Sequence, residues 1–310
     1  MRVLCLVTFL IVNGTASAQM AGRRQPIIDM HLHAYLLEPG DPAWPYKRMC
    51  VNNAKPCANG PSSYGAMSDY LLQGTVVMMK KYNVVLGFLS GDLAEVARWD
   101  AAAPGRFLPS AGVYDGLQVS VDSIRAALAQ GRVKGIGEIG AQYDGIPAND
   151  ARLEPYFALA ESLDAPVLIH TAGFGSREPA FRAYNGRPLL LEEVLVRHPR
   201  LRIYVENAGY PFLDDIVALM LQYPHVYVDV STITWLIPRA AFHAYLEALI
   251  RAGFAKRIMF GSDQLYWPEV IGEAVGAIES AKFLSAAQRQ DIFYNNAARF
   301  LRLQPSAKRP

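Results

Sequence analysis

The sequence has few cysteines and no surplus of one charge. Three of its 310 residues are Cys, and 30 Lys and Arg are nearly balanced by 28 Asp and Glu, for a formal net charge of +2. The basic residues are scattered, which argues against a nucleic-acid-binding surface. Because 52% of the residues are apolar, the chain can build one large core, and we expect its partner to be a small molecule.

Long apolar runs are also scarce. The run Val3–Val12 follows Arg2 and precedes Ala16–Ser17–Ala18, a small-residue pattern typical of signal-peptide cleavage. A buried helix or a membrane anchor is the alternative, but about ten apolar residues are too few to span a bilayer. We predict a signal peptide over residues 1–18, export to the periplasm or the medium, and no membrane association after cleavage.

Cleavage there would remove Cys5 and leave two cysteines. Cys50 and Cys57 lie in a loop rich in Pro, Asn and Gly. An oxidising compartment favours a disulfide between them. The alternatives are two free thiols or a pair of ligands for a soft metal, although their spacing matches no common zinc pattern.

The sequence shows no internal repeat, no second-domain linker and no Gly-x-Gly-x-x-Gly turn after its first apolar run, which argues against a doubly wound open sheet. Apolar, β-branched runs instead alternate with helical periodicity through most of the chain. The runs are Ile27–Ala34, Asn83–Gly91, Phe107–Tyr114, Val133–Tyr143, Pro166–Ala172, Leu201–Gly209, Val226–Thr232 and Arg257–Gln264. This pattern predicts a single-domain (β/α)8 TIM barrel over residues 26–303 with a tail at 304–310.

Helix signals support the same fold. Ser120–Gly131 has an early Asp and a terminal Gly, and Pro238–Gly253 begins with Pro and ends with Gly. Pro268–Ala281 and Ser285–Phe300 are expected to be the last helices. The long Pro-rich connection from Tyr35 to about Gly65 is interpreted as a lid or rim loop.

Polar residues recur late in these runs, where the carboxyl ends of barrel strands form active sites. On an extended first strand, His31 and His33 should point to one spot while Met30 and Leu32 pack the other way. Because buried charges are costly unless they are paired or bind a cation, one metal site would explain several members of the set together. The set is His31, His33, Glu138, His170, Glu206, Asn207, Asp229 and Asp263.

The chain resembles the amidohydrolase-2 branch of the amidohydrolase superfamily, which includes aminocarboxymuconate semialdehyde decarboxylase and related metal-dependent hydrolases. The matching pieces are His31–Leu32–His33, Gly137–Glu138–Ile139–Gly140, Ile169–His170–Thr171, Phe260–Gly261–Ser262–Asp263 and Asn295–Asn296–Ala297.

The resemblance implies metal ligands at His31, His33, His170 and Asp263, with Asp263 also moving a proton, and a further carboxylate at Glu138. Such ligands suit Zn, and also Mn, Fe or Ni. We expect one cation per chain rather than two.

One position departs from the family pattern. Asn207 stands where the sixth strand usually ends in His. An amide cannot take a proton at neutral pH, so a catalytic Asn207 could only donate a hydrogen bond or offer its carbonyl oxygen. A one-residue register shift would aim Glu206 inward as a carboxylate base. Asp229 is either a partner that orients a metal ligand or a satisfied strand-end carboxylate.

Aromatic residues above the strands are candidates for substrate binding, with rim packing as the alternative. These are Tyr143, Tyr210, Trp235, Tyr266 and Trp267, with Tyr114 and Phe174 nearby. Arg177 and Arg239 are candidates to hold a substrate carboxylate. His198, His225 and His243 fall away from the strand ends, so we expect no catalytic role for them.

The favoured activity is hydrolysis of a small-molecule amide, ester or lactone by a metal-activated water, with Asp263 as proton acceptor. A metal-dependent decarboxylase is the first alternative. A phosphodiesterase and a catalytically silent binding protein are further alternatives. The silent binding protein is an alternative because Asn207 stands where the family usually has His. A homodimer is compatible with the sequence.

Overall fold

A computed structural model describes residues 24–35, 67–175 and 179–304 of the protein. The predicted signal peptide, the Cys50–Cys57 pair and Arg177 lie outside these residues.

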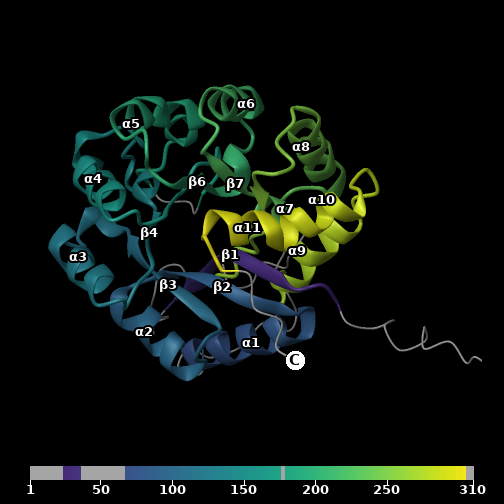
Figure 1. Ribbon diagram of the computed structural model, residues 1–310, viewed down its shortest axis with the longest axis horizontal. Helices are drawn as coiled ribbons and strands as arrows, with labels where there is room; N and C mark the ends of the chain where they lie inside the picture. The colour runs from purple at the N-terminus through teal and green to yellow at the C-terminus, as the bar shows by residue number, and fades with distance from the viewer. Residues whose placement is uncertain (1–23, 36–66, 176–178, 305–310) are drawn as a thin grey trace, which may run out of the picture.

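Eight parallel strands follow one another around the sheet in sequence order (Figure 1). They are β1 (Ile27–Ala34), β2 (Val84–Gly91), β3 (Phe107–Val113), β4 (Gly135–Ile139), β5 (Val167–Ile169), β6 (Ile203–Val205), β7 (Tyr227–Asp229) and β8 (Ile258–Met259). The residues after β8 turn back to β1, since Met30 N donates to Phe260 O at 2.9 Å and Asp263 N donates to His31 O at 2.9 Å. The sheet is a nearly closed barrel, and the predicted (β/α)8 fold is confirmed.

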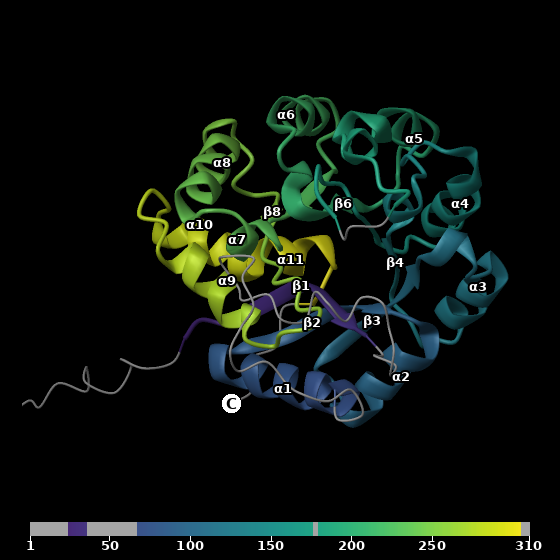
Figure 2. The same ribbon diagram turned by 180° about the vertical axis from the view of Figure 1, so that it is seen from behind.

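Helices connect the strands and cover the outside of the barrel, as Figures 1 and 2 show from its two ends. They are α1 (Met67–Tyr82), α2 (Leu93–Ala102), α3 (Val121–Ala129), α4 (Glu154–Ser162), α5 (Glu192–Arg197), α6 (Leu213–Gln222), α7 (Ile233–Leu236), α8 (Arg239–Arg251) and α9 (Val270–Glu279). Local signals set their ends: Ser120 caps α3 by accepting the Ser123 N–H at 3.1 Å, and Pro238 precedes α8. No helix among the described residues is long and apolar enough to cross a membrane.

The last predicted helix, Ser285–Phe300, is three segments in the structure. These are α10 (Ala286–Gln290), the π-helical η8 (Asp291–Asn295) and α11 (Asn296–Phe300). The Ile292 carbonyl accepts a hydrogen bond from the backbone of Phe260 at 2.9 Å. Because that carbonyl serves β8 instead of the helix, the regular α-helical pattern is interrupted there.

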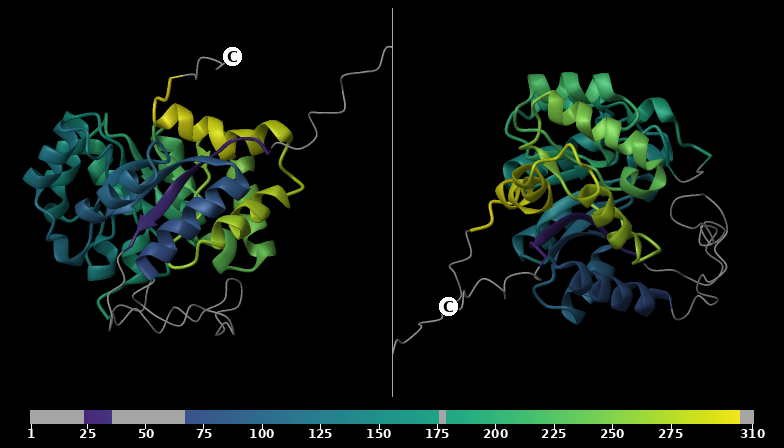
Figure 3. Two further views of the ribbon diagram at one scale, coloured as in Figure 1. Left: turned by 90° about the horizontal axis from the view of Figure 1, so that it is seen from below. Right: turned by 90° about the vertical axis from the view of Figure 1, so that its right-hand side faces the viewer.

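α11 also closes one end of the barrel, where Figure 1 shows it lying across β1 and Figure 3 shows it at the edge of the strands. The Asn296 side chain donates to the Ile258 and Ala255 carbonyls, at 2.7 and 2.9 Å. Phe300 and Ala297 pack against the residues that fill the barrel interior, which include Ile28, Met30, Phe88, Leu168, Tyr204 and Met259. This plug leaves the other end of the barrel, at the carboxyl ends of the strands, for polar side chains.

The expected alternation along the first strand is wrong at one point. Met30 packs inside the barrel, whereas Leu32 packs in the outer core between sheet and helices. The register of β1 against β2 shifts between Asp29 and Leu32. Such an irregularity breaks the two-residue period, so Met30 fills the interior while His31 and His33 still share one side.

Candidate metal centre

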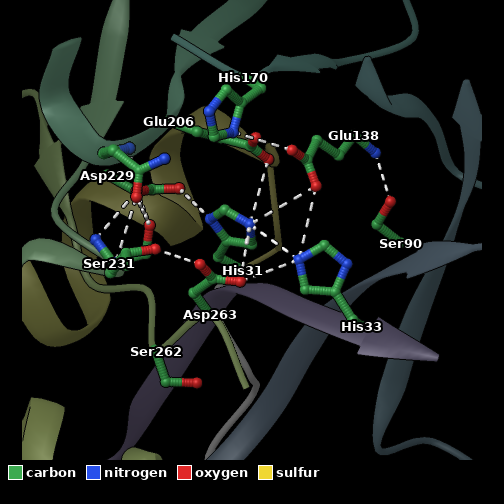
Figure 4. A network of polar contacts seen from close by, with 12 residues as sticks. His31, His33, Ser90, Glu138, His170, Glu206, Asp229, Ser231, Ser262 and Asp263 are labelled. Atoms are coloured by element: carbon green, nitrogen blue, oxygen red, sulfur yellow. Dashed lines mark hydrogen bonds and ion pairs between the residues drawn. The ribbon is translucent and has the colours of Figure 1, made fainter. Parts of the chain in front are cut away.

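Polar side chains from six strands meet at the carboxyl end of the barrel, as Figure 4 shows. His31 and His33 belong to β1 and Glu138 to β4, while Asp229 ends β7. The other three members lie after strands: His170 follows β5, Glu206 follows β6, and Asp263 lies in the turn after β8. All are buried except Asp263, whose side chain is 19% exposed. Asp263 is therefore the member that water or a substrate reaches first.

His31, His33, Asp263 and Glu138 point donor atoms at one spot. His31 Nε2 lies 3.1 Å from His33 Nε2 and 3.5 Å from Asp263 Oδ1. His33 Nε2 lies 3.0 Å from Asp263 Oδ1 and 3.5 Å from Glu138 Oε2. Two ligands of a tetrahedral zinc ion with bonds near 2.1 Å stand about 3.4 Å apart. The spacing of these atoms therefore fits a shared divalent cation.

Asp229 fixes which nitrogen of His31 faces this spot. Its Oδ2 accepts from His31 Nδ1 at 3.1 Å, so in neutral His31 the lone pair is on Nε2. Its Oδ1 accepts from the backbone N–H groups of Asn207 and Ser231, at 2.9 and 3.0 Å, and from the Ser231 hydroxyl at 2.6 Å. Of the two sequence-based interpretations of Asp229, this geometry favours the partner that orients a ligand.

Two glycines allow the strands to approach closely around the centre. A Cβ on Gly261 would lie 2.9 Å from His31 Cβ and 3.0 Å from Ser231 Cβ. Gly137 has a φ of 122°, and a Cβ there would lie 2.2 Å from the Leu168 carbonyl oxygen. The register of β4 against β5 shifts next to Gly137. Irregularities of this kind re-aim a side chain, and here the next residue, Glu138, carries its carboxylate into the barrel.

Hydrogen bonds hold the Glu138 carboxylate between two tyrosines. Tyr114 Oη donates to Oε2 at 3.2 Å, and Tyr143 Oη donates to Oε1 at 3.3 Å. Ser90, at the end of β2, accepts from the Glu138 backbone N–H and lies 2.8 Å from Tyr114 Oη. The tyrosines and Ser90 therefore hold both oxygens of Glu138 in place.

His170 lies beside Glu138 rather than in the group formed by His31, His33 and Asp263. Its Nδ1 is 3.0 Å from Glu138 Oε1 and 2.9 Å from Tyr143 Oη. Ligand atoms of Glu138, His170 and Glu206 all lie within 4.8 Å of one another. A second group of candidate ligands is thus adjacent to the first.

The turn after β6 places Glu206 inward. Asn207 and Ala208 have positive φ values of 57° and 48° in the short turn η7 (Glu206–Gly209). Glu206 is fully buried, its Oε1 is 3.6 Å from His31 Nε2, and neither carboxylate oxygen has a hydrogen-bond partner among the described residues. The side-chain Oδ1 of Asn207 accepts from Thr232 N at 3.2 Å and lies 3.1 Å from Ser231 Oγ. Glu206, and not Asn207, faces the imidazoles.

The carboxylates around His31 favour positive charge at its Nε2, whether a proton or a cation supplies it. Burial lowers its pKa, but the carboxylates of Glu206, Asp263 and Asp229 outweigh burial and hold the pKa well above its usual value. Burial and the nearby carboxylates Glu138, Asp229 and Asp263 raise the pKa of Glu206 well above its ordinary range, although His31 opposes them. Carboxylates crowded in a dry site are stable only with a proton or a cation between them.

The pKa values of the two other carboxylates shift down. Burial would raise the pKa of Glu138, but the hydrogen bond from His170 and the charges of His33, His170 and His31 lower it to about 2. Burial is likewise outweighed at Asp263 by His31, His33 and Thr232, whose hydroxyl donates to Oδ2, so its pKa lies below the usual range. Both groups are carboxylates at neutral pH, as ligation requires.

The predicted substrate-binding aromatics form two groups. Trp235, Trp267 and Tyr266 contact one another in series, with ring centroids 6.4 and 5.8 Å apart, and Tyr266 contacts Tyr35 at 5.3 Å. Tyr210 packs instead against Phe174 and Tyr245. Tyr143 differs from all of these because its hydroxyl reaches Glu138 and His170.

The contacts of the remaining histidines and of Arg239 lie elsewhere in the described part of the chain. His198 lies between Glu154 and Glu161, at 2.7 and 3.3 Å. His243 Nε2 lies 3.0 Å from the Ala277 carbonyl oxygen. Burial and Arg257 lower the pKa of His225. Arg239 begins α8, half-buried, and its Nη1 makes no hydrogen bond to any described residue.

Ser90 and Thr232 are the residues that sequence reasoning missed. Ser90 lies at the end of β2 and Thr232 lies just beyond β7, and each touches a charged member of the centre. Their position could have identified them. Polar residues at the carboxyl ends of barrel strands form the active site, which is why Glu138 and His170 were selected, and the same reasoning applies to small hydroxyl residues.

Known proteins share this architecture. The uncharacterised TIM-barrel protein Bb4693 from Bordetella bronchiseptica has a TM-score of 0.66 and 18% identity, over 90% of this chain and 99% of that one. A probable 2-pyrone-4,6-dicarboxylic acid hydrolase from Acinetobacter baumannii has a TM-score of 0.62 and 14% identity, over 89% and 99%. A 5-carboxyvanillate decarboxylase from Sphingomonas paucimobilis has a TM-score of 0.58 and 16% identity, over 90% and 99%. At these identities the likeness shows the fold alone.

Membership of a family rests on the sequence match. No curated protein matches the chain. The amidohydrolase family model of the amidohydrolase-2 branch matches residues 28–303, which include nearly all of β1, the seven other strands and every member of the centre. The chain therefore belongs to the amidohydrolase-2 family.

Proposed function

We propose that the protein is a metal-dependent hydrolase of a small-molecule ester, lactone or amide. One observation carries the proposal: the Nε2 atoms of His31 and His33 and Oδ1 of Asp263 lie 3.0–3.5 Å apart. These residues and Glu138 would hold a divalent cation, for which zinc is our first choice by ligand type. Such a cation supplies Lewis acidity, which polarises a carbonyl and makes water more acidic.

Protein side chains would carry out the proton transfers and contact the substrate. Asp263, ionised and partly exposed, would accept the proton of the attacking water at a carboxylate oxygen and return it to the leaving group. The Thr232 hydroxyl holds Oδ2 of Asp263, which leaves Oδ1 toward the histidines. The Trp235–Trp267–Tyr266 series would provide an apolar wall for the substrate.

A decarboxylase is less well supported. Stabilising a departing carboxylate calls for a nearby cationic side chain. Within residues 24–35, 67–175 and 179–304, the polar side-chain contacts of the centre involve His, carboxylate, Tyr, Ser and Thr groups and no Arg or Lys. This composition favours hydrolysis.

The test is turnover of an ester, lactone, amide and aryl-carboxylate panel by metal-loaded protein in ¹⁸O-labelled water. Hydrolysis places one ¹⁸O in the product acid, whereas decarboxylation releases CO₂ from unlabelled substrate. Chelation should abolish turnover and added zinc should restore it. Release of CO₂ as the main product, or no turnover anywhere in the panel, contradicts the proposal.

Asp263→Asn tests the assigned proton acceptor. We expect kcat/KM to fall by about 10²–10⁴-fold, the usual contribution of a general base, while His31 and His33 still bind metal. Metal content and steady-state kinetics of the same preparation check this. A variant that keeps metal and full turnover would remove Asp263 from the mechanism.

The proposal places this activity outside the cytoplasm. The support is the N-terminal pattern that ends at Ala16–Ser17–Ala18. N-terminal sequencing of protein recovered from the periplasm or medium should begin at Gln19. Recovery of the intact chain in the cytoplasm alone would count against export.

A further inference from the structure

We propose that a cavity at the amino end of the barrel binds a small carboxylic acid with an apolar body. The cavity has a volume of about 410 Å³, which is within the range of sites that hold small molecules. Its lining comes from the start of β1, the end of α9 and the segments α10 and η8. Figures 1 and 2 show the start of β1 close to α9.

Part of the cavity wall is apolar. Ile27 and Phe293 line the cavity and belong to the core of the protein, with 2% and 1% of their surface exposed. Ala286, at the start of α10, adds a small apolar side chain to the lining. Water gains little from contact with such a surface, whereas an apolar ligand body is removed from water there. The wall therefore favours a ligand with a hydrocarbon part.

The lining also carries an excess of one positive charge. Two guanidinium groups, those of Arg24 and Arg289, line the cavity together with one carboxylate, that of Glu279. Arg24 Nη1 lies 3.4 Å from Glu279 Oε1, and the guanidinium carbon of Arg24 lies 4.8 Å from the centroid of the Tyr82 ring. These contacts pair Arg24 with Glu279. The charge of Arg289 is thus the one that remains for a ligand.

Arg289 selects the chemistry of the ligand. Within residues 24–35, 67–175 and 179–304 it makes no ion pair; its Nη2 lies 3.4 Å from the Leu284 carbonyl oxygen, and its buried Nε has no hydrogen-bond partner. A buried donor without an acceptor is costly. A guanidinium presents paired N–H groups that match the two oxygens of a carboxylate. Because only one charge is in excess, a monocarboxylate suits the cavity better than a phosphate dianion.

The cavity is separate from the metal centre. Ile27 begins β1 and lies about 13 Å from His31 along an extended strand. No residue that lines the cavity is a member of the centre, so a carboxylate bound there needs no cation. The site therefore goes beyond the proposed function and does not depend on it.

The experiment is a calorimetric titration of the full-length protein with octanoate at pH 7, in zinc-loaded and in chelator-stripped form. We expect one octanoate per chain, with the same Kd in both forms. Two matched probes divide the ligand into its parts: octanamide keeps the apolar chain without the charge, and acetate keeps the charge without the chain. Each should bind at least about tenfold more weakly than octanoate.

Two cavity variants and one control locate the bound octanoate. Arg289→Met keeps a long apolar side chain without the charge and should weaken binding by about tenfold or more. Ala286→Phe should weaken it too, because the larger side chain occupies the cavity while both arginines remain. Arg125→Met removes an exposed arginine of α3, on the opposite side of the barrel (Figure 1), and should bind octanoate as the wild type does.

Several results would overturn the cavity site. These are no octanoate binding by the wild type, equal affinity for octanamide or acetate, or unchanged affinity in both cavity variants. Binding that requires zinc would place octanoate at the metal centre instead. If Arg289→Met does not fold, Ala286→Phe still decides, since Ala286 is exposed on α10. All of these readouts are independent of turnover, so failure of the proposed hydrolase activity would leave them unchanged.

Discussion

At the scale of single residues, the candidate metal centre depends on side chains outside the proposed ligand set. One carboxylate oxygen of Asp229 accepts a hydrogen bond from His31 Nδ1, and the other accepts hydrogen bonds from three donors. All four partners present hydrogens, so only a carboxylate satisfies them. The orientation of His31 is therefore set by a residue on the opposite side of its ring.

We predict that Asp229→Asn weakens metal binding by about 10–100-fold, the usual effect of losing such a partner. Whichever way the amide turns, its NH₂ group faces a donor. Calorimetric titration of stripped protein with Zn²⁺ measures the change. Asp215→Asn, which alters a buried carboxylate paired with Arg187 elsewhere, should leave the affinity unchanged. Equal affinities for the two variants would count against the role of Asp229.

The sequence predicts the positions of most of these residues but not all of their neighbours. His31, His33 and Asp263 follow from strand ends, and the structure brings them together. The choice between Asn207 and Glu206 depends on two consecutive positive φ values in η7, at Asn207 and Ala208. Asn tolerates a positive φ but Ala rarely adopts one, so the sequence does not mark the turn as a whole. Side-chain alternation alone therefore leaves both Glu206 and Asn207 as candidates.

At the scale of elements, irregular strands position the candidate ligands. β4 carries Glu138 next to Gly137, and β1 shifts register around His31, just before His33. Apolar runs predict where strands exist, but β5, β6 and β8 are shorter than their runs because the later residues turn into the site. The two shifts, between Asp29 and Leu32 and between Ile136 and Ile139, are backbone events that hydropathy does not indicate.

Gly137→Ala should therefore damage the centre through the backbone. The added Cβ would lie 2.2 Å from Leu168 O at a φ that L residues avoid, so we expect a loss of stability of about 1–3 kcal/mol and weaker metal binding. Gly105→Ala is the control, since Gly105 also has positive φ but a Cβ added there would meet no atom within 4 Å. Thermal unfolding and Zn²⁺ titration compare them. Equal effects in both variants would exclude the close approach as the cause.

The π-helical segment η8 has its own electrostatic anchor. Asp291 accepts from Lys256 Nζ at 2.6 Å and from Asn295 Nδ2 at 2.9 Å. Burial would raise the pKa of Asp291, but these partners outweigh burial and lower it. A carboxyl with a lowered folded pKa stabilises the protein above its unfolded pKa, near 4, and that contribution is lost as pH falls through the folded value.

Asp291→Asn should accordingly cost about 1 kcal/mol at pH 7, since Lys256 is largely exposed and solvent screens the pair. The difference from wild type should shrink below about pH 4. Thermal unfolding at pH 7 and pH 3 measures it, with Asp122→Asn, an almost fully exposed carboxylate, as control. A difference that stays constant with pH would contradict the electrostatic explanation.

At the scale of the whole molecule, the first and last strands meet at the centre. Asp29 Oδ1 accepts from the His31 and Ser262 backbone N–H groups, at 3.1 and 3.0 Å. The candidate ligands His31 and Asp263 lie beside this junction. The barrel itself was predictable because eight apolar runs alternate with helices, whereas this junction depends on contacts between residues more than two hundred positions apart.

Metal removal should lower the stability of the entire barrel. A ligand present at 100 times its Kd stabilises the folded state by about 2.7 kcal/mol. Chelation should therefore lower the Tm by several degrees, and zinc should restore it. The double variant His31→Ala/His33→Ala should not respond to either treatment. An unchanged Tm on chelation of loaded wild type would mean that the cation does not join the two strands.

The position of Asp263 after the last strand also sets the order of events during synthesis. A growing chain displays His31 and His33 early, but it has no aspartate to complete the set until the last strand emerges. Loading is thus a late step of maturation. If the chain crosses a membrane unfolded, as we propose, the barrel would close on the far side, and the ions of that compartment, not those of the cytoplasm, would determine which metal the protein acquires.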